Sequence, residues 1–73
     1  MPYVNIKVTR EGGPDGTGPS DSQKARLIDG VTRLLQDVLG KTPATTFVVI
    51  DEVAIESWGV GGLPVQDYRK QEV

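Results

Sequence analysis

The chain has 73 residues, with 8 basic against 10 acidic side chains and a net charge of −2. A chain of this length forms one small domain whose own core leaves little net stability, so we expect a single domain over residues 1–73. The sequence contains no cysteine and no histidine, which excludes disulfides, a thiolate nucleophile and imidazole metal ligands. Self-association therefore remains as the source of extra stability.

The charge balance also limits the partners. A net charge of −2 without a basic stripe argues against a surface that neutralises nucleic-acid phosphates. No apolar run approaches the roughly 20 residues of a membrane span, and the first residues lack the pattern of a secretory signal. We expect a soluble cytoplasmic protein that contacts neither nucleic acid nor membrane.

Residues 2–9 alternate between apolar and more polar side chains, which is the period of a half-buried strand. Pro2 stands at its start, directly behind Met1. Removal of Met1 would leave Pro2 with a secondary amine whose neutral form can accept a proton. α-Amino groups titrate near ~7.7 to 8.0, a range that suits a general base. The alternative interpretation is that a Met-Pro start is merely well processed.

The segment 10–19 is dense in glycine and proline and predicts an exposed loop. Gly13 and Gly18 have the spacing of a phosphate-binding loop. That loop needs Lys followed by Ser or Thr after the second glycine, whereas Pro19 and Ser20 stand here. The mismatch argues against nucleotide binding.

A helix is predicted over about residues 20–39. Ser20 and Gln23 fit a capping box, apolar residues recur every three or four positions, and Gly40 is placed to end the helix. Gly30 inside this helix costs roughly 1 kcal/mol relative to alanine. We expect it to permit a close approach of the helix to the sheet.

A second strand is predicted over residues 45–53, and its run 47–50 is apolar on both faces, which indicates a strand covered on both sides. The order strand, helix, strand predicts parallel pairing. Residues 59–62 can turn the chain back as a short hairpin, and the polar tail 66–73 is expected to fray or dock on a neighbour. The predicted fold is α/β: a single βαβ unit with a short C-terminal hairpin and a sheet completed by oligomerisation.

Three further positions are candidate site residues. Asp51 and Glu52 are adjacent acids at a strand end, but neighbouring strand residues face opposite ways, so Glu52 alone is kept for a supporting role. Arg10 lies roughly 27 Å along the strand from Pro2 and can act on it only from a neighbouring subunit; otherwise it is a solvated edge charge. Trp58, beside a glycine turn, either walls an apolar pocket or packs in an interface.

The assembled pattern resembles the 4-oxalocrotonate tautomerase family. The resemblance is carried by the start Met1–Val8, by the helix start Ser20–Lys24 and by the segment Glu52–Gly62 with its Trp-Gly-Val-Gly-Gly turn. It implies a hexamer built as a trimer of dimers, in which the N-terminal proline moves a proton between carbons of an enol or keto acid without metal or cofactor. It also implies that Trp58 borders the active site.

Two departures from the family pattern concern substrate binding. Its best-known members carry one arginine just before the helix and another in the second strand, where this chain has Pro19 and Phe47. The longer loop allows Arg10 to stand in for the first arginine, but Phe47 cannot replace the second. We expect a tautomerase acting on a small 2-keto acid; the alternatives are a hydratase or dehalogenase on the same scaffold, with Glu52 activating water, or a non-catalytic oligomeric binding module.

Overall fold

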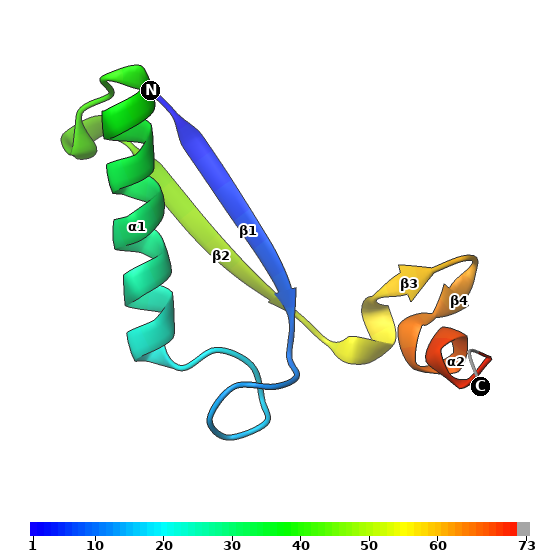
Figure 1. Ribbon diagram of the computed structural model, residues 1–73. Coiled ribbons are helices and arrows are strands. Elements are labelled where there is room, and N and C mark those ends of the chain that lie inside the picture. Colours follow the sequence, from blue (N-terminus) through cyan, green and yellow to red (C-terminus); the bar gives the residue numbers. More distant parts are fainter. Residues whose placement is uncertain (72–73) are drawn as a thin grey trace.

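A computed structural model describes residues 1–71 of the chain (Figure 1). Its regular elements, in chain order, are β1 (Tyr3–Thr9), α1 (Asp21–Leu39), β2 (Phe47–Val53), β3 (Gly59–Val60), β4 (Leu63–Pro64) and α2 (Val65–Lys70), with 3₁₀ turns at Pro43–Thr45 and Ile55–Ser57. Within the described residues, no helix is long and apolar enough to cross a membrane.

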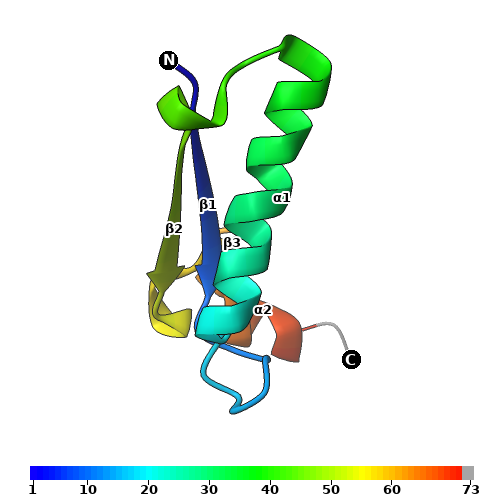
Figure 2. The ribbon, with the colours of Figure 1, turned by 90° about the vertical axis from the view of Figure 1, so that its left-hand side faces the viewer.

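The first three elements form the predicted βαβ unit. Strands β1 and β2 are parallel, with Tyr3 opposite Phe47 at one end and Thr9 opposite Val53 at the other. Figure 2 shows α1 lying along one side of this two-stranded sheet. Strands β3 and β4 form the expected short antiparallel hairpin. The fold class inferred from the sequence is therefore confirmed.

Local signals set both ends of α1. The Ser20 hydroxyl accepts a hydrogen bond from the Gln23 backbone N–H at 3.1 Å, and the Gln23 side chain accepts one from the Ser20 N–H at 2.9 Å. At the other end, Gly40 adopts a left-handed conformation with φ of 67°, which glycine reaches without a steric penalty. The capping box and the glycine cap are both confirmed.

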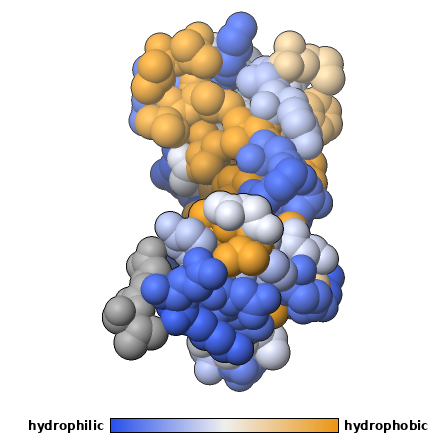
Figure 3. All heavy atoms as spheres, turned by 90° about the vertical axis from the view of Figure 1, so that its right-hand side faces the viewer, coloured by the Kyte–Doolittle hydropathy of each residue, from blue (hydrophilic) through white to orange (hydrophobic). Residues whose placement is uncertain are grey.

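The chain has almost no core of its own. Val65 is the one buried hydrophobic residue among residues 1–71, whereas Tyr3 is 64%, Phe47 50% and Val49 42% exposed. These three residues lie on the sheet face turned away from α1, because alternate strand residues point to opposite faces. Figure 3 shows a broad apolar surface on the upper part of this side of the molecule. The prediction that residues 47–50 are covered on both faces of the strand is therefore wrong for one chain, because its single helix covers only one face of the sheet.

The C-terminal arm, residues 54–71, projects away from the βαβ unit beyond the end of β2 (Figure 1). Instead of fraying, part of the polar tail forms α2, which packs on the β3–β4 hairpin. The Val65 N–H donates to the Trp58 carbonyl at 2.8 Å, and the Tyr68 ring lies close over Gly61. Residues 72 and 73, the end of the predicted tail, lie outside the described residues.

Gly30 does not have the role inferred for it. A Cβ added at this position would meet no heavy atom within 4 Å, so the helix makes no close approach to the sheet there. The residue lies on the exposed face of α1.

Replacing Gly30 with alanine is therefore expected to raise the free energy of unfolding by about 1 kcal/mol, because alanine has the higher helix propensity and meets no clash. Chemical denaturation of both proteins at one protein concentration measures the difference. A destabilised variant would contradict the expectation and indicate that another chain covers this face of α1.

Candidate active site

Pro2 lies at the open start of β1. Its carbonyl accepts a hydrogen bond from the Phe47 backbone N–H at 3.0 Å, which ties it to the start of β2. Pro2 is half-buried, and the residues beside it in the two strands, Tyr3 and Phe47, have exposed side chains on the open sheet face. With Met1 attached, the Pro2 nitrogen is an amide whose lone pair is delocalised, so it is not basic. Only removal of Met1 creates a base at this position.

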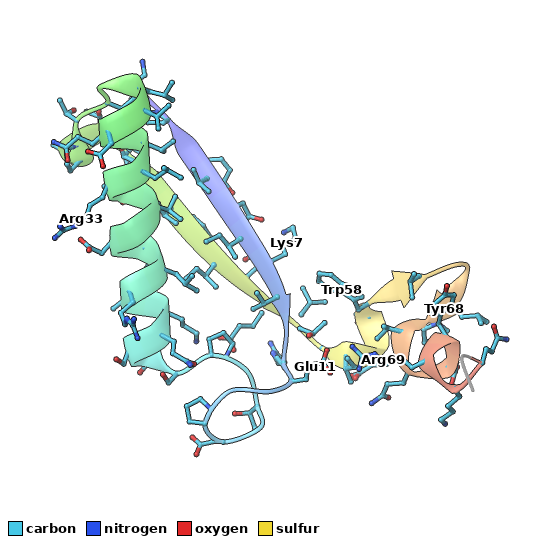
Figure 4. The ribbon with its side chains drawn as sticks, in the orientation of Figure 1. Lys7, Glu11, Arg33, Trp58, Tyr68 and Arg69 are labelled. Carbon is cyan, nitrogen blue, oxygen red and sulfur yellow. The ribbon has the colours of Figure 1, made fainter. Side chains whose placement is uncertain are left out.

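The other candidate residues lie at the opposite end of the same strand. Arg10 follows directly after β1, where its N–H donates to the Val53 carbonyl at 2.9 Å. Trp58 lies in the C-terminal arm beyond the end of β2 (Figure 4). Strand β1 has seven residues, so its first and last residues lie about 20 Å apart. One chain therefore brings neither Arg10 nor Trp58 to its own Pro2.

The paired carboxylates at the end of β2 point in opposite directions, as the strand alternation predicts. Glu52 faces α1 and accepts a hydrogen bond from Lys24 at 2.5 Å, with both side chains 27% exposed. Asp51 faces the open side and accepts from Lys7 and Asn5, each at 2.8 Å. The Lys7 ammonium, together with Asn5, lowers the pKa of Asp51. Both carboxylates are therefore engaged by cations.

A hollow of about 600 Å³ opens at the Arg10 end of the molecule. It lies between the end of β1, the glycine-rich loop and the first turns of α1, and Glu11, Gln23 and Arg26 contribute polar side chains to its wall. Because Pro2 lies at the far end of β1, this hollow is separate from the proline within one chain. Among residues 1–71, no group of Asp and Glu side chains is arranged to hold a metal ion.

An ion pair at this same end was not predicted from the sequence. Arg69 of α2 donates to both carboxylate oxygens of Glu11, at 3.0 and 3.1 Å, and the Thr9 hydroxyl donates to the same carboxylate at 2.8 Å. Figure 4 shows the two labelled side chains meeting between the sheet and the arm. The hydrogen bonds from Arg69 and Thr9 lower the pKa of Glu11 from 4.5 to about 2. A separation of 58 residues leaves no sequence signal for this pair.

The depressed pKa of Glu11 is directly measurable. Because its folded-state pKa lies below the ordinary value, Glu11 stabilises the fold above about pH 4.5 and loses this contribution as the pH falls toward 2. In an Arg69→Met variant, the pKa of Glu11 should rise toward its ordinary value, because Arg69 is the largest cause of the shift. Carboxyl chemical shifts followed through an NMR pH titration give both values. Arg33→Met, which breaks an ion pair within α1, is the matched control and should leave Glu11 unchanged; a wild-type value near 4.5 would contradict the prediction.

Comparison with known proteins places the chain in a family. The family model for "Tautomerase enzyme" matches residues 2–68. The chain is 51% identical over 71 residues to the probable tautomerase K2 of Dickeya dadantii, covering 97% of each protein. It is 36% identical over 67 residues to the 2-hydroxymuconate tautomerase of Comamonas testosteroni, covering 92% of this chain and 95% of that protein.

A solved structure agrees with the sequence relatives. The crystal structure of DmpI from Helicobacter pylori is 42% identical, with a TM-score of 0.80 over 94% of this chain and 97% of that one. The matched region includes both the βαβ unit and the C-terminal arm, because it covers nearly all of both chains. The parallel βαβ unit, the C-terminal hairpin and these relatives together identify the chain as an isomerase of the 4-oxalocrotonate tautomerase family.

Proposed function

We propose that this enzyme moves a proton between the enol and keto forms of a small 2-keto acid, with Pro2 as general base and acid and without a cofactor. The observation that carries the proposal is the position of Pro2 at the open start of β1 in a chain of this family. Removal of Met1 would give Pro2 a secondary amine. The sequence has no histidine or cysteine to serve as an alternative base.

In the proposed reaction, the neutral amine of Pro2 accepts the hydroxyl proton of the enol. The oxygen lone pair then forms the carbonyl, and the carbon–carbon double bond takes a proton back from the Pro2 ammonium at the neighbouring carbon. The substrate neither gains nor loses electrons, so no redox partner is needed. Pro2 ends each cycle in the neutral form in which it began.

We propose that the site is shared between subunits of a homo-oligomer, as a hexamer built from three dimers. Two features support assembly: the apolar sheet face opposite α1 is uncovered, and β1 and β2 pair only with each other within residues 1–71. A neighbouring chain would supply the Trp58 that borders Pro2. Burial beside this apolar ring would lower the pKa of the Pro2 amine and so favour its basic form.

The side chains near the proline bear on the class of substrate. Phe47 adjoins Pro2 and offers an apolar surface in place of a cation. We therefore propose a monocarboxylate with an apolar or aromatic substituent, such as the enol of phenylpyruvate. A guanidinium binds a carboxylate through two parallel hydrogen bonds, and Arg10 of a neighbouring subunit is the proposed partner. The exposed Arg10 side chain forms no salt bridge among the described residues.

The hydratase or dehalogenase alternative is less well supported. It requires a free carboxylate near the proline to activate water, yet Lys24 binds Glu52 and Lys7 binds Asp51. A non-catalytic binding role is separated from catalysis by the following experiment.

Activity should depend on the processed N-terminus. Intact mass identifies protein with and without Met1, and only the processed form should ketonise the phenylpyruvate enol. Pro2→Ala leaves a primary amine in a looser position and should lower kcat/KM by roughly 10²-fold. Equal turnover by the Met1-retaining and processed proteins would rule out Pro2 as the base, since an amide nitrogen cannot accept the proton.

A shared site also predicts complementation between two impaired variants. Pro2→Ala and Trp58→Ala should each damage one half of the site, and within one chain these residues lie beyond opposite ends of the β1–β2 sheet. Unfolding and refolding the two variants together should create some sites with both native residues, so the mixture should exceed the summed activity of the separately refolded variants. Sedimentation confirms that mixed oligomers form. Mixed oligomers without a gain in activity would contradict a site shared in this way.

A further inference from the structure

The C-terminal arm has few connections to the rest of the chain. Its regular elements pack mainly on one another: α2 contacts β3, β4 and the 3₁₀ turn Ile55–Ser57. Its backbone hydrogen bonds likewise stay within the arm, as between Val65 and Trp58. Apart from the covalent link at the end of β2, the pair Glu11–Arg69 is the one side-chain hydrogen-bonded contact between the arm and the βαβ unit among residues 1–71.

The geometry of this pair suits it for orienting the arm. Two parallel hydrogen bonds between a planar guanidinium and a planar carboxylate fix direction as well as distance. The Thr9 hydroxyl holds the Glu11 carboxylate from the strand side at 2.8 Å. The contact therefore runs from the last residue of β1 through Glu11 to α2, and α2 is packed against the hairpin that follows Trp58.

We propose that Glu11 and Arg69 form a clamp that positions the C-terminal arm, and thereby places Trp58 for the substrate site of a neighbouring subunit. The role in catalysis rests on the proposed function; the role in placing Trp58 does not. Both residues are positioning residues, because they act through Trp58 and do not themselves contact the substrate.

The Glu11–Arg69 pair can orient the C-terminal arm more than it can stabilise the fold. The side chains of Arg69 and Glu11 are 56% and 39% exposed. Ion pairs exposed to this degree contribute little to the stability of a fold, because solvent screens them. Without the clamp, the arm keeps its internal packing but can turn about the connection after β2. A small displacement of a positioning group is enough to reduce catalysis strongly.

The chain offers a direct reporter, since Trp58 is its single tryptophan. In Arg69→Met and in Glu11→Gln, the Trp58 emission maximum should shift and its quenching by acrylamide should change at least two-fold, while thermal unfolding stays close to wild type. The matched control is Arg33→Met, which removes an exposed arginine paired with Asp29 within α1 and should leave the emission unchanged. Unchanged emission in both clamp variants would overturn the proposal, whether or not the protein is active.

The kinetic prediction distinguishes the clamp from the chemistry. With the phenylpyruvate enol, the clamp variants should lose roughly 10-fold in kcat/KM, because a displaced Trp58 neither lines the site nor lowers the pKa of the Pro2 amine. The exchanged pair Glu11→Arg with Arg69→Glu should recover most of the loss and restore the wild-type emission, whereas either single change should not. Wild-type kcat/KM in both clamp variants, or no recovery in the exchanged pair, would overturn the clamp. If the Trp58 emission shifts in the clamp variants as expected, but the wild-type protein shows no ketonisation activity, the clamp stands and the proposed function is overturned.

Discussion

One helix can cover only one face of a two-stranded sheet, and this limit determines the rest of the structure. The sequence supplies apolar side chains for both faces, yet the chain folds with a single covering helix. Tyr3, Phe47 and Val49 are consequently left exposed on the second face. Val65, the single buried hydrophobic residue among residues 1–71, belongs to the arm and not to the βαβ unit. Such a chain lacks a self-sufficient core.

The same limit explains why the candidate site is divided. A parallel βαβ unit places the start of β1 and the segment after β2 at opposite ends of the sheet. Pro2 is at one end, and Arg10 and Trp58 are at the other. Residues that are proposed to act together, but that one chain holds at opposite ends of a seven-residue strand, can meet only when chains assemble. Burial of the open sheet face and completion of the site would then be one event.

Ion pairs define the environment of the site more than they stabilise the fold. Lys24 and Lys7 pair with the two carboxylates near the end of β2, so neither carboxylate is a free base. Arg69 does the same for Glu11 while joining the arm to the strand. Each pair is partly exposed, so its contribution to stability is small. The larger effect of each pair is that its carboxylate is engaged by a cation and is not free to act as a base.

The sequence by itself determined the features that depend on neighbouring residues. The alternation of apolar and polar side chains predicted β1, the capping box of Ser20 and Gln23 predicted the start of α1, and the glycines at 59–62 predicted the hairpin. Each of these signals acts over a few neighbouring residues. The position of Pro2 behind Met1 is likewise a property of the chain alone. Tertiary structure decided the rest: which face of β2 is covered, the open surroundings of Gly30, and the contact of Glu11 with Arg69. These depend on how distant segments meet, and a pairing across 58 residues leaves no local pattern from which it could be predicted.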